Sequence, residues 1–265
     1  GWTLPDLDRA VLALGSATGS ATPPYIQPPA LDDTLLVQLS HVVRLQKTLN
    51  LPVERLAAWW ASNLGSDKAL CEWWTLSYID HDHSGQPVLP SLYERVFRNK
   101  NVVNPLDSAF KEDPGQLSGS LSGCSETITA ALGISTGDLT LLFHDANVIP
   151  HQAAHPTKPD DALNLAYLAK LHRHVGLAQT LKLSIRDYLS LLKLISPDPF
   201  ASTLATVRFV ERVEQMRTSG FSVTQLNYLL RDEYTHASGV APSEQQIGVF
   251  LNNLRAGLKT ITDEN

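Results

Sequence analysis

Apolar residues recur along much of the chain at intervals of three and four positions, which places them on one face of an α-helix. In the segment 207–216 three valines and a methionine share one such face, while Arg208 and Glu211 lie on the opposite face. The same periodicity predicts helices at 35–49, 162–175, 183–195 and 247–258, and shorter helices at 92–97 and after Thr3, Leu51, Ser135 and Ser222. Alternating runs typical of strands extend over no more than about four residues, which is short for a strand. The pattern predicts an all-α protein with little or no β structure.

A short phrase that marks helix starts occurs five times, beginning at positions 2, 51, 134, 183 and 221. In four copies a Ser or Thr is followed three residues later by Asp or Gln. The hydroxyl can then accept from the N3 backbone N–H while the N3 side chain bonds back to the cap. These predicted N-caps are Thr3, Ser135, Ser184 and Ser222. The copy at Leu51 has no such acceptor, so either Asn50 caps that helix or the helix begins loosely.

The helical phrases are unevenly spaced, which disfavours a regular tandem solenoid and favours an irregularly stacked helical array. Stretches rich in Gly, Pro and Ser separate the predicted helices, and a loop is expected over 150–160. The stretch 111–125 carries three glycines among serines, a composition typical of a flexible linker. The sequence therefore predicts an N-terminal helical part over 1–110, a flexible connector over 111–125 and a C-terminal helical part over 126–265.

The net charge of −6 and the pI near 5.8, with no run of Lys or Arg, argue against a nucleic-acid partner and an anionic membrane surface. The longest apolar stretches fall far short of the ~20 residues that span a bilayer, so we expect no direct membrane insertion by this segment. Cys71 and Cys124 lack the spacing of a zinc site or a disulfide framework and are interpreted as free thiols. The chain opens on a helix start without an initial Met or signal sequence, which suggests an internal segment of a longer protein.

The most ligand-like cluster is the tract Asp80, His81, Asp82 and His83. Alternating carboxylates and imidazoles can bind a divalent ion, but residues two apart converge only on an extended backbone, and no further ligand lies at zinc-site spacing. A solvated loop is therefore the preferred interpretation, with metal binding as one alternative. The other alternative is a pH-sensitive loop, since imidazole titrates between about pH 5 and 8.

The remaining histidines give no combined site. His172 and His174 lie two positions apart in a predicted helix, so their rings cannot hold one ion together, and a polar, Pro-rich connector explains His144, His151 and His155. No phosphate-binding Gly loop, HExxH or GxSxG motif occurs, and the sequence predicts no catalytic residue, no metal and no cofactor. A dispersed Ser/His/Asp triad stays open, because its members need not be close in sequence.

Two tryptophan pairs, Trp59-Trp60 and Trp73-Trp74, are unusual in a chain with five tryptophans. Indole is usually well buried, so we expect these pairs to pack in the core and between elements. The alternative is a surface that binds a partner protein or a sugar.

Four segments, taken in order, carry a resemblance to a known family: GWTLPDLDRA at 1–10, the segment 49–60, SLYERVFRNK at 91–100 with NPLD at 104–107, and the segment 163–200. They resemble the helical shell region of the A subunits of bacterial Tc (toxin complex) insecticidal toxins. That family has a GWSLxELDxAL helix, an LxLxxxxLLxLW helix, a SLYxRLFxNP segment and later LGLSxxDLLxLLxLxGxDPF. The Gly/Ser-rich stretch after Lys111 and the form NKNVVNP depart from its pattern.

The resemblance implies that the parent is a very large chain that forms a bell-shaped pentamer, in which an α-helical shell surrounds a translocation channel and opens on a change of pH. We therefore expect a structural shell segment without catalysis of its own, secreted or at the cell surface as part of a bacterial toxin complex. Its expected partners are the rest of its own chain, other protomers, and a host receptor or glycan. The alternatives are a receptor- or glycan-binding module of the toxin and a hydrolase with a dispersed triad.

Overall fold

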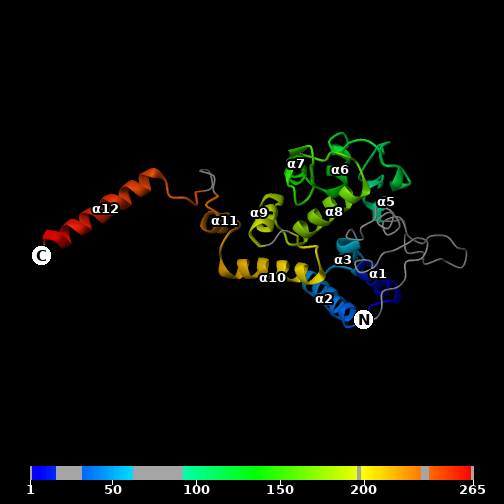
Figure 1. The fold of residues 1–265 in the computed structure, drawn as a ribbon, viewed down its shortest axis with the longest axis horizontal. Helices are drawn as coiled ribbons and strands as arrows, with labels where there is room; N and C mark the ends of the chain where they lie inside the picture. Colours follow the sequence, from blue (N-terminus) through cyan, green and yellow to red (C-terminus); the bar gives the residue numbers. More distant parts are fainter. Residues whose placement is uncertain (1, 16–31, 62–91, 196–197, 234–238, 264–265) are drawn as a thin grey trace, which may run out of the picture. The chain divides into compact units, whose positions relative to one another are not determined.

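The structure, a computed structural model, describes residues 2–15, 32–61, 92–195, 198–233 and 239–263 (Figure 1). The described residues are mostly helical, as the apolar periodicity predicts. They belong to two compact units, Gly1–Val213 and Glu214–Asn265.

The helices of the first unit are α1 (Leu4–Gly15), α2 (Asp33–Leu49), α3 (Val53–Ala61), α5 (Leu92–Phe97), α6 (Ser125–Leu132), α7 (Thr136–His144), α8 (Leu165–Thr180) and α9 (Ile185–Ile195). A short 3₁₀ helix, η1, covers Pro114–Gln116. Helix α10 (Thr203–Ser219) begins in the first unit and ends in the second, which also holds α11 (Val223–Arg231) and α12 (Glu244–Asp263).

Side-chain caps explain where several helices begin. Each of the four predicted caps directly precedes a helix, and Ser135 and Ser222 form complete capping boxes with Asp138 and Gln225. At the copy of the phrase that begins at Leu51, Asn50 ends α2 in the left-handed conformation with φ 52°, so it does not cap α3. Helix α3 starts after Pro52 without a side-chain cap among the described contacts, which matches the loose beginning expected there.

Two groups of helices build the first unit. Helices α1, α2 and α3 pack against one another, and α3 also contacts α8. Helix α9 contacts both α8 and α7, while α6 contacts α5 and α7. Trp59 and Trp60 are both buried, and the indole N–H of Trp60 donates to the hydroxyl of Thr206 at 3.2 Å. The described tryptophan pair therefore packs in the core, as expected.

The segment 150–160, expected as a loop, contains a short antiparallel hairpin of β1 (His151–Gln152) and β2 (His155–Pro159). Strand β1 has two residues, and β2 (HPTKP) has no alternation of apolar and polar residues and contains two prolines, so no strand pattern marks the hairpin in the sequence. The hairpin contacts α7 and adds a small amount of β structure to a helical unit.

The segment 111–125, expected as a flexible connector, is held to the residues that precede α8. The N–H of Leu121 donates to the carbonyl of Asp161 at 2.9 Å, and the N–H of Leu163 donates to that of Gly119 at 3.1 Å. Leu121 and Cys124 are buried. These bonds fix the segment within the first unit, and the chain divides into its two units after Val213 instead.

Candidate functional site

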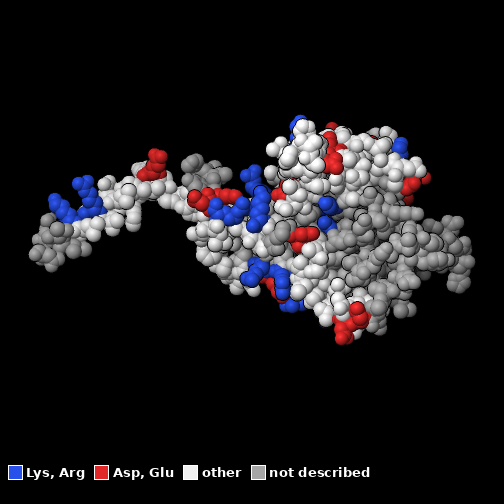
Figure 2. Space-filling model, viewed as in Figure 1, with Lys and Arg blue, Asp and Glu red and all other residues white. Residues whose placement is uncertain are grey.

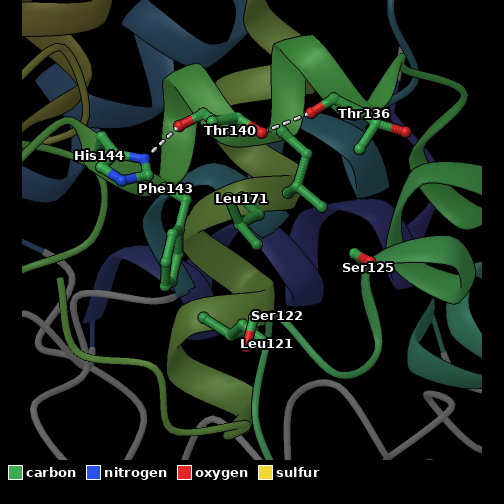
Figure 3. Close-up of a pocket in the computed structure, with 9 residues that line it drawn as sticks. Leu121, Ser122, Ser125, Thr136, Thr140, Phe143, His144 and Leu171 are labelled. Atoms are coloured by element: carbon green, nitrogen blue, oxygen red, sulfur yellow. Dashed lines mark hydrogen bonds between the residues drawn. The ribbon is translucent and has the colours of Figure 1, made fainter.

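A pocket of about 290 Å³ opens beside α7 in the first unit (Figure 3). Its walls come from the segment that leads into α6, from the first residue of α6, from one face of α7 and from α8. The lining residues are Leu121, Ser122, Ser125, Thr136, Leu139, Thr140, Phe143, His144 and Leu171.

The inner part of the pocket is apolar. Leu121, Leu139 and Leu171 are buried, and the ring of Phe143 is partly buried beside them. Figure 3 shows Phe143 from α7, Leu171 from α8 and Leu121 from the segment before α6 around the same space. The five lining residues of α7 stand three and four positions apart, which places them on one helical face.

The outer part of the pocket is polar and more exposed. The hydroxyl of Thr140 donates to the carbonyl of Thr136 at 2.9 Å, and Nδ1 of His144 lies 2.9 Å from the carbonyl oxygen of Thr140. A carbonyl oxygen can only accept, so Nδ1 of His144 carries the proton in this contact. In the neutral ring, Nε2 is then left as a hydrogen-bond acceptor.

The hydroxyls of the pocket do not join into a catalytic triad within the described residues. Ser122 donates its hydroxyl directly to the carboxylate of Asp161 at 2.5 Å, and His144 bonds to a backbone carbonyl. The hydroxyl of Ser125 makes no hydrogen bond to another described residue. A triad requires a serine, a histidine and a carboxylate in one connected chain, and the contacts of this pocket connect them differently.

A second polar cluster lies inside the unit, where α8 meets α9. Arg173 and His174 are buried in α8, and Nδ1 of His174 lies 2.8 Å from the hydroxyl oxygen of Tyr188 in α9. The guanidinium of Arg173 lies 4.8 Å from the ring centre of Phe200. Burial lowers the pKa of Arg173 from its usual value, and the nearby Asp198 carboxylate opposes that shift.

The same burial acts on the histidines of α8. Loss of water lowers the pKa of His174 well below its usual value, and the positive charges of Arg173 and Lys170 lower it further. The side chain of His172 keeps some exposure, but its Nδ1 is buried. Burial, assisted by the charge of Arg55, lowers the pKa of His172 to about 4. Both rings are therefore neutral near pH 7.

The other histidines and the cysteine have structural contacts. Nδ1 of His151 lies 2.6 Å from the carbonyl oxygen of Pro156, which closes the hairpin. Cys124 is a buried free thiol, and burial together with the neighbouring Asp107 raises its pKa to about 11. A thiol with such a pKa is a poor nucleophile at neutral pH.

Several sequence predictions lie outside the described residues, so their geometry stays a prediction. These are the tract Asp80, His81, Asp82 and His83, the tryptophans Trp73 and Trp74, and Cys71. Among the residues that are described, no three His, Cys, Asp or Glu side chains come together as a metal site. No helix in the described ranges is long and apolar enough to cross a membrane.

The second unit carries a large apolar surface. Of its described apolar side chains, Val223 is buried, while Leu229 and Leu230 of α11 are 61% and 69% exposed. Helix α12 exposes a further set: Ile247, Val249, Phe250, Leu251, Leu254 and Leu258. Ile247, Leu251, Leu254 and Leu258 follow one another at four, three and four positions, so they form one stripe along the helix. Figure 2 shows that charged side chains leave much of α12 uncovered.

Two features were not predicted from the sequence: the pocket and the start of α12, which begins at Glu244 rather than at 247. The pocket's signal is the spacing of Thr136, Leu139, Thr140, Phe143 and His144 on one face of a predicted helix. Helix α12 begins with a further cap, in which the N–H of Gln246 donates to the hydroxyl of Ser243 at 3.2 Å.

Comparison with known proteins finds no matching family model, no matching curated protein and no matching solved structure. The class that the described residues define is a mostly helical protein with a small, largely apolar pocket beside α7 and an exposed apolar helix face.

Proposed function

We propose that this chain is a structural α-helical shell segment of a Tc-toxin-like A component. In this role it acts by protein–protein contact with the rest of its own chain and with other protomers, and it performs no catalysis of its own. The resemblance of the segments 1–10, 49–60, 91–100 with 104–107, and 163–200 to that shell region supports this role, as does the mostly helical structure.

The observation that carries this proposal is the apolar stripe of α12. Ile247, Leu251 and Leu254 are 43%, 54% and 49% exposed, and the neighbouring Phe250 is 63% exposed. Exposed apolar surface of this extent on a soluble chain usually marks an interface, because its burial is favourable by roughly 25 cal/mol per Å². A shell segment, packed on both sides by further protein, has such a surface.

The small size of the second unit supports the same role. It spans Glu214–Asn265, a length at which a helical unit gains little stability from its own core. Among its described residues Val223 is buried, whereas most of the large apolar side chains of α11 and α12 are exposed. Packing against neighbouring protein would supply the missing core.

The experiment compares two variants of the full-length parent protein. Leu251→Glu with Leu254→Glu places charges on the apolar stripe, while Asn252→Glu with Asn253→Glu adds the same charges to the same helix beside it. We expect the wild-type protein and the asparagine variant to form one closed oligomer by light scattering and electron microscopy, and the leucine variant to lose it. Assembly of both variants alike, or a parent that is monomeric, would refute the proposal.

Two further assays separate the alternatives. Saturable binding of the 265-residue chain to host cells or to a glycan array favours a receptor- or glycan-binding module. Hydrolysis of ester or peptide substrates that is lost on changing His144→Ala favours a hydrolase. A structural shell segment gives neither result.

A further inference from the structure

We propose that the pocket beside α7 is a binding site for one small, neutral aromatic alcohol, with the ring against the buried leucines and the hydroxyl at the polar mouth. This assignment does not depend on the scaffold role, because the pocket lies within the first unit and the apolar stripe of α12 belongs to the second.

The size and floor of the pocket fit a single ring. An apolar cavity of about 150 Å³ lined by Leu, Ile and Phe is known to bind benzene. The present pocket holds about 290 Å³, which is at the lower end of the range for small-molecule sites and leaves room for one substituent. Leu121, Leu139 and Leu171 supply its buried floor. Phe143 adds an aromatic wall, which favours an aromatic ligand over an aliphatic one of equal size.

The polar mouth fits a hydroxyl group. The Thr140 hydroxyl donates its hydrogen bond to the carbonyl of Thr136, and its oxygen can still accept a hydrogen bond from a ligand. His144 likewise uses Nδ1 on the carbonyl of Thr140, which leaves Nε2 of the neutral ring as an acceptor. Ser125 contributes a hydroxyl that bonds to no other described residue. The lining therefore offers a ligand hydroxyl both hydrogen-bond acceptors and, from Ser125, a donor.

The charge of the lining sets the class of ligand further. None of the nine lining residues is Asp, Glu, Lys or Arg. A carboxylate or ammonium ligand would lose hydration without gaining a charged partner, which is unfavourable. The chemistry of the pocket thus selects a neutral phenol-type molecule over a charged one.

The first test titrates 4-methylphenol into the 265-residue chain and follows backbone amide resonances by NMR. We expect saturable shifts with a dissociation constant on the order of 1 mM, as befits a ligand of so few atoms. The shifts should be confined to residues 121–125, 136–144 and the neighbourhood of Leu171. Toluene, which lacks the hydroxyl, should bind about threefold to tenfold more weakly.

The second test uses variants of two exposed residues of α7 and of Ser125, the first residue of α6. Thr140→Trp puts an indole across the mouth and should weaken binding about tenfold or more. Leu141→Trp introduces the same side chain on the same helix, outside the lining, and should bind as the wild type does. Ser125→Ala should reduce the preference for 4-methylphenol over toluene, because the acceptors of Thr140 and His144 remain. Circular dichroism checks that each variant is folded.

Three results would overturn the assignment. They are shifts that do not saturate or that map to another surface, equal binding by Thr140→Trp and Leu141→Trp, and an unchanged preference in Ser125→Ala. If Thr140→Trp does not fold, the mapping of the wild-type shifts and the Ser125→Ala comparison still decide the matter.

Discussion

Nδ1 of His174 in α8 lies 2.8 Å from the hydroxyl oxygen of Tyr188 in α9, and both side chains are buried. The two rings also meet edge to face, with centres 5.8 Å apart. Burial raises the pKa of Tyr188 well above its usual value and lowers that of His174, so both groups are neutral and share one neutral hydrogen bond. This pair joins two helices through a polar contact inside an apolar core.

Removing one partner of this pair should be costly. Tyr188→Phe leaves Nδ1 of His174 buried without its hydroxyl, and we expect a loss of about 1–3 kcal/mol in the free energy of unfolding. His174→Leu combined with Tyr188→Phe removes both polar groups, so the double variant should lose less than the sum of the two single variants. Urea unfolding of the wild type and the three variants measures the difference. Additive losses would mean that the two groups do not stabilise each other.

The buried histidines of α8 predict a stability that falls in acid. The pKa of His172 is lowered to about 4 in the folded protein, whereas an unfolded histidine titrates near 6.5. Between these values the unfolded chain binds more protons than the folded chain, so the free energy of unfolding decreases as the pH falls from 6.5 toward 4. The loss due to His172 is roughly 2–3 kcal/mol, and His174 adds to it in the same direction.

The variant His172→Gln cannot take up the proton, so its stability should fall less steeply over this pH range. His155→Gln is the matched control, because His155 is exposed. Urea unfolding at several pH values from 7 to 4 gives the comparison. Parallel curves for His172→Gln and the wild type would remove His172 as a source of the acid sensitivity.

The cap of α9 offers a test of the helix-start phrase. The N–H of Asp187 donates to the hydroxyl of Ser184 at 3.1 Å, and that hydroxyl donates to the Asp187 carboxylate at 2.8 Å. Ser184→Ala removes both bonds and should cost about 0.5–2 kcal/mol of stability. Ser190→Ala makes the same change inside the same helix, where Ala is the better helix former, and should cost nothing. Equal effects of the two changes would contradict a capping role for Ser184.

The helical class and the main helix starts could be predicted because both depend on residues close in sequence. The caps at Ser135, Ser184 and Ser222 need only the residue three positions later, and the apolar stripes repeat within a few turns. The start of α12 at Ser243 uses the same chemistry with Gln246. The sequence does not mark this helix start in the same way, because Pro242 stands before the serine where the other copies have a Trp, Ile, Leu or Phe.

The pocket and the buried polar cluster could not be predicted, because each depends on residues far apart in the chain. Leu121 and Leu171 line one pocket although 50 positions separate them. For Arg173 and His174, charge and polarity suggest the exposed side of a helix. Phe200 and Tyr188, from other parts of the chain, cover these side chains and turn that face of α8 inward.

Two glycines should respond in opposite directions to the same substitution. Gly176 lies inside α8, and a Cβ added there would meet Nε1 of Trp59 at 3.7 Å, an ordinary contact. Gly176→Ala should therefore raise the free energy of unfolding by about 0.5–1 kcal/mol, because alanine loses less backbone entropy than glycine in a helix. Gly133 ends α6 with φ 63°, a left-handed conformation that costs other residues about 1–2 kcal/mol. Gly133→Ala should lower stability by that amount although its Cβ has space, and thermal or urea unfolding of the two variants gives both signs. A loss of stability in Gly176→Ala would contradict the space described between α8 and Trp59. A gain in Gly133→Ala would contradict the left-handed conformation at the end of α6.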